Sequence, residues 1–411
     1  MKKLWSTAVF AAAILGMTAC ASAALGQTPT SIRIGYAISL SGPNAAGAGI
    51  TVLPNYRLWV KEVNAAGGIM LKSAGKRVPI EVIEYDDHSD EDDTVKAVER
   101  LITQDKVDFI LPPWGTGLNL AVGPLLNRAG YPDLAVTALS DKAPELAKLW
   151  PNSFWFLGTS TGAAQALVDT LSKLRAEGKI GGSVVMLSVA DEFGTELAKA
   201  ARGVMRKDGF DFVYDRSYPV DDLQDMHSIM AEVKRLNPDV FVAFSYPPDT
   251  MAITEQALAL SFNPKIFYTA VGTAFPMYKQ RFGTDVEGVM GIGGWNPDAP
   301  GTKDYVKRLI AVTGQEPDGW ASPITYASLQ MLQEAIERVG KVDRAAVIKE
   351  LQTGTFQTIV GAIKLKDNMY TDTWYLGQWQ KGEYHGISPA TLPGAKPVMF
   401  PKPPWHGDPD R

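Results

Sequence analysis

Short apolar runs alternate with segments of helical periodicity along most of the chain. From residue 31 to about 294, runs typical of buried strands are each followed by a stretch in which apolar positions recur every three to four residues. The first cycle predicts strands at 32–39, 78–85, 109–111 and 134–137 and helices at 49–64, 90–103 and 118–126. The second predicts helices at 162–177, 192–207, 222–236 and 248–260 and strands at 184–189, 212–218, 240–244, 266–269 and 289–292. Such alternation is typical of βαβ units and parallel sheets.

The length and the two cycles together predict two doubly wound lobes, because 411 residues exceed one ordinary core. The remainder is mixed, with helices expected at 302–312, 324–339 and 344–351 and strands at 356–365 and 373–380. Seven prolines follow between 389 and 411. This C-terminal tail is expected to be extended and peripheral.

The first 23 residues have the pattern of a secretory signal peptide. Lys2 and Lys3 precede an apolar run at 8–17, and small residues at 21–23 form a cleavage site. The mature protein is therefore expected to be exported to the periplasm. Cys20, the only cysteine, lies in this leader, so lipid anchoring is an alternative and no disulfide is expected. The net charge of −5 gives no sign of a nucleic acid or an anionic membrane as partner.

The stretch 107–130 combines a short strand, a small-residue turn and a helix. The turn, Trp114-Gly115-Thr116-Gly117, follows two prolines and precedes helical periodicity that ends at Gly130. Backbone N–H groups at such a helix start attract anions, and in a doubly wound sheet this position faces the ligand crevice. Thr116 is therefore predicted to help hold an anionic group.

Several aromatic residues occupy comparable places. Trp114, Phe193, Tyr246 and Trp295 each follow the expected carboxyl end of a strand, where such sheets bind ligands. Taken singly, each such aromatic residue is more often a core or lobe-interface residue than a ligand contact. Together they favour a ligand with an apolar body.

Two motifs suggest chemistry but have simpler explanations. Residues 158–162 match the G-x-S-x-G nucleophile elbow, which makes an exported serine hydrolase using Ser160 a remote alternative; Ser160 or Thr161 serves equally well as a helix cap. The acidic run 86–93 resembles a calcium loop but lacks its glycine and distal glutamate, so a helix cap is preferred. No phosphate-binding loop, zinc motif or dinucleotide fingerprint occurs, so no catalytic residue, metal or cofactor is expected.

The chain resembles the leucine/isoleucine/valine-binding family of periplasmic solute-binding proteins, which serve ABC importers. The resemblance spans about 31 to 380 in the family's order. It rests on these segments: 32–35 with 40–43, 63–69, 84–87, 144–146, 191–194 and 324–327.

The resemblance implies a type I periplasmic binding protein, with two α/β lobes that close on a ligand about a three-crossover hinge. Lobe 1 is expected at 30–157 plus 295–360 and lobe 2 at 158–294 plus 361–388, followed by the tail 389–411. The crossovers are expected near Gly158, Gly294 and Gly361. The G-x-S-x-G pentad then becomes a crossover and helix start, and the protein is expected not to be an enzyme.

The resemblance also implies binding positions. The family's carboxylate-binding serine falls at Thr116, beside Trp114 and Gly115, and a second set of carboxylate contacts falls at Leu139 and Ser140. Pocket aromatics fall at Phe193 and near Tyr246.

Two positions depart from the family's pattern. Where the family has an aromatic residue after Ser41-Gly42-Pro43, this chain has a glycine, at about Gly47, which predicts a roomier pocket. Where the family has the acidic residue that pairs with a ligand ammonium, this chain has a valine, at about Val271. A buried ammonium without a partner is costly, so an α-amino acid is a poor ligand unless another carboxylate such as Asp141 substitutes. The sequence therefore predicts a small carboxylate with an apolar or aromatic body, with Trp295 among its contacts. A branched-chain or other amino acid, or an amide, is the alternative. A monomer that delivers its ligand to importer permease subunits is expected.

Overall fold

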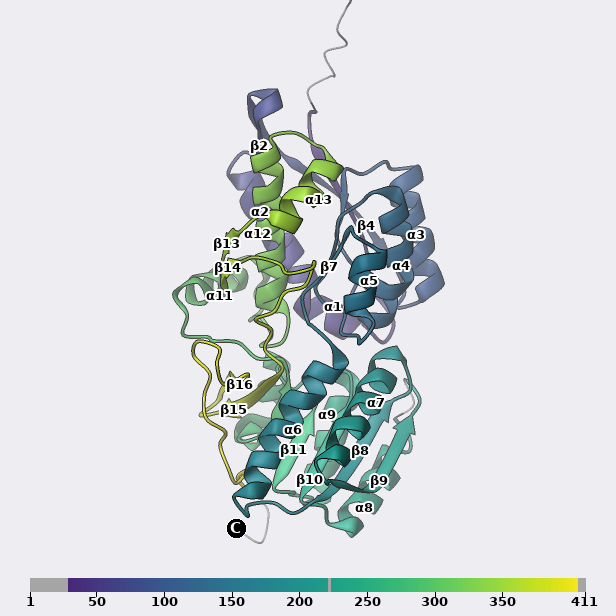
Figure 1. Cartoon of the computed structure of the whole chain (residues 1–411), viewed down its shortest axis with the longest axis vertical. Coiled ribbons are helices and arrows are strands. Elements are labelled where there is room, and N and C mark those ends of the chain that lie inside the picture. Colours follow the sequence, from purple (N-terminus) through teal and green to yellow (C-terminus); the bar gives the residue numbers. More distant parts are fainter. Residues whose placement is uncertain (1–28, 221–222, 406–411) are drawn as a thin grey trace, which may run out of the picture.

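The computed structural model describes residues 29–220 and 223–405, which form two α/β lobes stacked along the long axis of the molecule (Figure 1). The signal peptide at 1–23 and Cys20 lie outside these residues. Among the described helices, none is both long and apolar enough to cross a membrane.

Lobe 1 has a parallel sheet of order β4-β1-β5, and the parallel pair β6-β7 lies beyond it. Two two-stranded antiparallel sheets, β2-β3 and β13-β14, complete its strands. The strands are β1 (Ile32–Ile38), β2 (Ile69–Leu71), β3 (Lys76–Val78), β4 (Ile80–Asp86), β5 (Phe109–Ile110), β6 (Asp133–Ala135), β7 (Ser153–Trp155), β13 (Phe356–Thr358) and β14 (Gly361–Ile363). The helices are α1 (Ala45–Thr51), α2 (Leu53–Ala65), α3 (Glu91–Thr103), α4 (Thr116–Ala129), α5 (Ala143–Leu149), α11 (Pro300–Thr313), α12 (Ser322–Val339) and α13 (Arg344–Thr353). Helices α11 and α12 return from the distant part of the chain to pack on α2.

Lobe 2 is built on a seven-stranded sheet of order β16-β15-β12-β11-β10-β8-β9. The strands are β8 (Ser183–Val189), β9 (Asp211–Tyr218), β10 (Val240–Phe244), β11 (Ile266–Thr269), β12 (Met290–Ile292), β15 (Leu376–Gln380) and β16 (Glu383–Ser388). The helices are α6 (Ser160–Ala176), α7 (Glu192–Lys207), α8 (Met226–Leu236), α9 (Pro247–Ala259) and α10 (Pro276–Phe282). The sheet is parallel from β9 to β12, but β15 and β16 join its edge antiparallel. The parallel pairing predicted for the alternating region up to about 294 is therefore found in this sheet, and the antiparallel edge comes from the later, mixed part of the chain, where a tight turn at 381–382 joins two consecutive strands.

Three connections join the lobes. The first, 156–159, runs from β7 to α6, and the second, 293–299, runs from β12 to α11. Gly158 and Gly294 lie in these connections, where the chains pack too closely for a side chain: a Cβ on Gly158 would lie 2.2 Å from the Tyr375 hydroxyl. The third connection starts later than predicted, because Gly361 is still paired with Thr358 in the β13–β14 hairpin, and the chain reaches lobe 2 only at Leu376.

Two further expectations are corrected. The helix predicted at 49–64 is two helices, α1 and α2, that meet at Val52; Pro54 explains the break, because its ring lacks an N–H and clashes with the preceding turn. The proline-rich tail is extended as predicted but not peripheral. Trp405 is almost fully buried, donates its indole N–H to the Phe262 carbonyl and packs edge-on against Phe267. This contact fastens the chain end to lobe 2.

Candidate functional site

A cavity of about 150 Å³, here called the cleft cavity, lies between the lobes. It sits where loops leave the carboxyl ends of strands in both lobes, the place at which open α/β sheets bind ligands. Its lining residues are Pro43, Asn44, Ser89, Glu91, Gly115, Gly117, Leu118, Asp191, Glu192, Val220 and Tyr246. Across the same cleft, α4 contacts α7 and α1 contacts α9, so the lobes are closed on one another.

Buried aromatic rings run from lobe 1 into lobe 2 beside the cleft cavity. Tyr246 stacks on Phe193, with ring centroids 5.1 Å apart, and lies 5.5 Å from the ring of Trp114. Trp320 meets Trp114 edge-on at 6.0 Å. The indole N–H of Trp114 is buried and has no hydrogen-bond partner among the described residues. A buried donor without a partner costs about 1–3 kcal/mol; Trp114 itself is fully buried behind the residues that line the cleft cavity.

Gly47 does not make the pocket roomier, contrary to the prediction. The Trp114 ring lies directly against it, and a Cβ on Gly47 would fall 2.2 Å from Trp114 Cζ2. The sequence shows that an aromatic residue is absent from position 47. It does not show that a side chain from the β5–α4 turn fills the same space.

Thr116 is the first residue of α4, and its hydroxyl joins that helix to the loop after β6. The hydroxyl accepts from the Leu139 N–H at 3.2 Å and lies 3.4 Å from the Leu139 carbonyl oxygen, to which it donates. Gly115 precedes it with φ 99°, a conformation that glycine adopts readily, and donates its N–H to the Thr137 hydroxyl. Gly115 and Gly117 line the cleft cavity, so the positive end of α4 faces it. The anion-attracting group at this end is therefore the helix start itself, which Thr116 holds in position.

Ser140 is engaged by a carboxylate of the protein. Glu196 on α7 accepts from the Ser140 hydroxyl at 3.0 Å and from the Asp141 N–H at 3.0 Å, while the Ser160 hydroxyl donates to it at 3.3 Å. The Lys142 ammonium lies 3.6 Å from the same carboxylate. These contacts, here called the Glu196 latch, join the loop after β6 in lobe 1 to α7 in lobe 2, with Ser160 supporting the carboxylate from α6 of lobe 2. Glu196 was missed by sequence reasoning, although it lies one helical turn after Glu192 and within reach of the matched segment 191–194.

The cleft cavity is acidic, with Glu91, Asp191 and Glu192 in its lining. Asp191 caps α7 through the Gly194 N–H at 2.8 Å and accepts the Tyr246 hydroxyl at 2.6 Å. Burial raises the pKa of Asp191, and these two hydrogen bonds oppose that rise. Asp191 could not be recognised as a cleft residue from the sequence. It belongs to the segment 191–194 that matches the family, and that match was used only as evidence for the fold.

A second buried carboxylate, that of Asp249, holds the backbone of Tyr246 in position. Asp249 accepts the Tyr246 backbone N–H at 2.9 Å and the hydroxyl of Tyr218. Burial raises the pKa of Asp249 to about 7, and the hydrogen bonds that it accepts limit the rise. Tyr246 is thereby fixed at the start of α9 with its ring toward the cleft.

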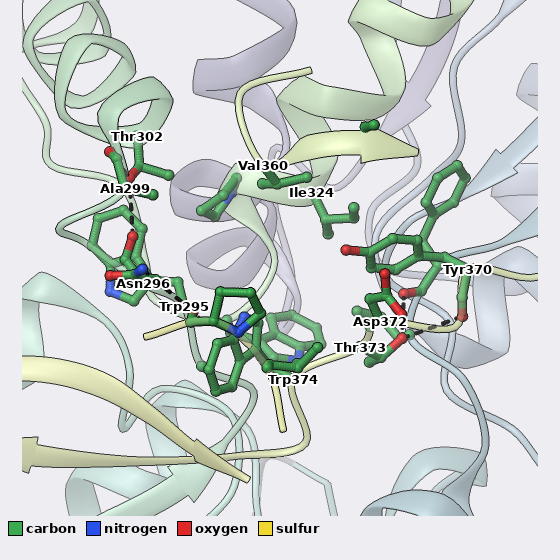
Figure 2. A pocket seen from close by; sticks show the side chains of 18 residues that line it. Trp295, Asn296, Ala299, Thr302, Ile324, Val360, Tyr370, Asp372, Thr373 and Trp374 are labelled. Atoms are coloured by element: carbon green, nitrogen blue, oxygen red, sulfur yellow. Dashed lines mark hydrogen bonds between the residues drawn. The ribbon is translucent and has the colours of Figure 1, made fainter. Parts of the chain in front are cut away.

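Val271 and Trp295 lie away from the cleft cavity. Val271 is buried in lobe 2, with its N–H donated to Ser245 and its carbonyl accepting from Thr250. Trp295 belongs to the second connection and donates its indole N–H to the Tyr384 carbonyl at 2.8 Å. It lines a separate cavity between the connections (Figure 2).

The chemical motifs have structural roles. Thr159, rather than Ser160 or Thr161, caps α6 by accepting from the Gly162 N–H, and Ser160 is fully buried at the Glu196 latch. No histidine in the described part of the chain hydrogen-bonds to Ser160, so a serine nucleophile has no base there. Asp90 caps α3, as expected for the acidic run, and no cluster of possible metal ligands occurs among residues 29–220 and 223–405.

Comparison with known proteins extends these observations. A model of the periplasmic binding protein family matches residues 31–383. A Leu/Ile/Val-binding protein homolog of Brucella melitensis is 24% identical over 388 residues, which cover 89% of this chain and 93% of that protein.

Two solved structures share the fold. A branched-chain amino acid transporter substrate-binding protein of Streptococcus pneumoniae, in complex with isoleucine, gives a TM-score of 0.73 at 20% identity, covering 87% of this chain and all of that one. A solute-binding protein of an ABC transporter from R. palustris, in complex with benzoate, gives 0.74 at 18% identity, covering 90% and 99%. The two-lobed fold predicted from the sequence is thereby confirmed.

Proposed function

Because the chain belongs to the periplasmic binding protein family, whose members bind solutes and are not enzymes, we propose that it captures a small carboxylate with an apolar or aromatic body for an ABC importer. Binding takes place in the cleft cavity, and closure of the lobes completes the site. Importer permease subunits are the partners that receive the ligand. The family is extracytoplasmic, in keeping with the leader predicted at 1–23.

The observation that carries this proposal is the pairing of donors with aromatic rings at the cleft. The start of α4 directs the positive end of the helix dipole to the cavity, which Gly115 and Gly117 line; the Gly115 N–H itself is donated to the Thr137 hydroxyl. The unpartnered indole N–H of Trp114 lies in the same turn. These donors suit a carboxylate, and Tyr246 with its neighbouring rings suits the apolar body. A cavity of this size is comparable with one that accommodates benzene.

Lobe closure contributes to affinity by removing the ligand's apolar surface from water, at about 25 cal/mol per Å². The cleft walls come from loops of both lobes, so the ligand contacts a complete set of partners only in the closed form. A ligand that binds the closed form better shifts the lobes toward it. The R. palustris neighbour, solved with benzoate, supports an aromatic acid as one member of the ligand class.

An amino acid is the second candidate, and one observation favours it. Asp191 and Glu192 line the cleft cavity from lobe 2, opposite the α4 helix start. A carboxylate at this place can pair with a ligand ammonium, whereas the Val271 side chain cannot. The neighbour solved with isoleucine supports this candidate. The two candidates share the carboxylate and the apolar body and differ only in the ammonium group.

Matched ligand pairs separate the candidates. Thermal unfolding is measured with 3-phenylpropionate against phenylalanine, with 4-methylpentanoate against leucine, and with benzoate. A ligand at 100 times its Kd stabilises the folded form by about 2.7 kcal/mol, which shifts the midpoint by several degrees. We expect the acids to raise the midpoint. Stabilisation by leucine with no effect of any acid would refute the acid and establish the amino acid.

A variant pair locates the site. Tyr246→Ala removes a ring of the cleft, and we expect it to abolish the shift caused by any active ligand. Tyr214→Ala, on the edge strand β9 and outside both cavities, is the matched control and should keep the shift. Equal shifts in the two variants would place binding elsewhere.

A further inference from the structure

A second cavity, of about 230 Å³ and here called the hinge cavity, lies where the three connections between the lobes meet. In Figure 2, Tyr370, Asp372 and Thr373 lie on one side, Asn296 and Thr302 on the other, and Trp374 between them. None of the residues that line it also lines the cleft cavity. It is therefore a separate site, and nothing in the proposed function uses it.

Aromatic rings supply much of its wall. They are Phe156, Trp295, Trp320, Tyr370 and Trp374. Trp374 is held flat against Gly386, where a Cβ would lie 2.2 Å from its ring, and Tyr370 packs 6.4 Å from Phe156. These rings are fixed by packing and by the backbone, so the cavity is largely formed in advance.

The polar groups of the cavity point to a cation. Thr302, Thr373 and Asn296 all donate to backbone carbonyl oxygens, so their hydrogen bonds are made within the protein. The charged group that remains for a ligand is the exposed carboxylate of Asp372, which lies beside the Tyr370 hydroxyl. No lysine or arginine occurs among the described residues that line the cavity.

We propose that the hinge cavity binds a small organic ammonium with an apolar body. The ammonium pairs with Asp372 and lies among rings whose faces attract cations, by about 0.5–2 kcal/mol for each well-placed ring. The apolar body fills the space beside Ile324 and Val360. A carboxylate ligand is disfavoured here, because the only charged group in the lining is an acid.

Binding at this place affects the lobes. The cavity walls come from all three connections, so the shape of the cavity depends on the angle between the lobes. A ligand that fits the cavity in the closed arrangement shifts the population toward it. Trp320 joins the two sites directly, since it lines the hinge cavity and meets Trp114 of the cleft at 6.0 Å.

Calorimetric titration of the full chain with 2-phenylethylammonium, phenylacetate and 2-phenylethanol tests the proposal. We expect the ammonium to bind and the alcohol to bind more weakly, whereas any heat from phenylacetate, which suits the cleft, should be unchanged in Ala362→Phe. Asp372→Asn should weaken ammonium binding roughly two- to fivefold by removing the charge, the size typical of an ion pair at an exposed carboxylate. Ala362→Phe, which places a ring in the cavity from an exposed hairpin position, should abolish it.

Controls separate the hinge from the acidic cleft. Asp367→Asn removes a charge from the same connection at a residue outside the lining and should leave ammonium binding unchanged. Asp191→Asn reports binding in the cleft. The proposal is overturned if the wild type does not bind the ammonium, if Asp372→Asn binds it as well as wild type, or if Asp191→Asn alone loses it.

Discussion

Replacing Glu196 by alanine should open the lobes without unfolding either of them. The Glu196 carboxylate joins lobe 2 to the Ser140 hydroxyl and the Asp141 N–H of lobe 1, each at 3.0 Å. Its side chain is only 13% exposed, so these hydrogen bonds are largely shielded from water. All cross-lobe contacts of the latch exist only in the closed form. Their loss therefore acts on the equilibrium between closed and open lobes.

The magnitude follows from the chemistry of the contacts. A hydrogen bond to a charged group contributes about 1.5–3 kcal/mol, and Ser140 is fully buried, so its hydroxyl loses its partner without gaining water while the lobes stay closed. The contacts share one carboxylate, so their contributions do not simply add. We expect Glu196→Ala to weaken closure by about 2–3 kcal/mol, which is roughly 30- to 150-fold in the equilibrium.

Small-angle scattering of the ligand-free protein measures the effect as an increase in radius of gyration, and thermal unfolding checks that both lobes remain folded. Glu192→Gln is the control on the same helix. Its ion pair with Lys142 is well exposed, and such pairs contribute about 0–1 kcal/mol, so little opening is expected. The reasoning fails if Glu196→Ala scatters like the wild type, or if Glu192→Gln opens the lobes to the same extent.

Three further predictions concern single side chains. Thr116→Val removes the hydroxyl that bridges to Leu139 and should lower the free energy of unfolding by about 1–2 kcal/mol and weaken ligand binding, whereas Thr116→Ser should retain both in the same assays. The raised pKa of Asp249, about 7, means that its neutral form stabilises the fold most at low pH. This contribution is lost as pH rises from about 4 to 7, so urea unfolding of wild type and Asp249→Asn should differ in pH dependence across that window and run parallel above it. Trp405→Ala should cost about 3–5 kcal/mol in urea unfolding, because it removes a buried ring that packs on Phe267; an unchanged midpoint would show that the tail is not fastened there.

The regular elements of lobe 2 could be predicted closely because local signals agree there. The expected strands at 240–244 and 266–269 are β10 and β11 to the residue, and the helix at 192–207 is α7. Helix α7 begins and ends at strong signals: Asp191 accepts the Gly194 N–H as an N-cap, and Gly209 lies just beyond the helix. Where the hydrophobic pattern, the N-cap and the terminating glycine agree, the local sequence determines the bounds of the helix.

The errors arose where distant contacts decide the structure. Strand β16 was missed because its pairing with β15 at the sheet edge is specified by the turn and by lobe packing rather than by a strong apolar run. The proline-rich composition of the tail predicts an extended chain, which is found, but it carries no information about the contacts that bury Trp405. At the cleft, the loops that meet could be predicted, because strand ends and the family pattern locate them. The direction of each side chain could not be predicted, and it is this direction that places the Trp114 ring against Gly47.

The Glu196 latch changes how the ligand's carboxylate can be held. A ligand acid at Ser140 has to compete with a carboxylate that is already part of the chain and is satisfied by hydrogen bonds at 3.0 Å. Bringing a second carboxylate beside it adds like-charge repulsion in a site with little water. The α4 helix start, which no side chain caps, and the unpartnered Trp114 N–H remain as donors, with the Glu91 carboxylate beside Gly117, 2.9 Å from where a Cβ would lie. Specificity is then decided by what lies opposite those donors, and Asp191 favours a ligand whose far end is neutral or positive over one that carries a second negative charge.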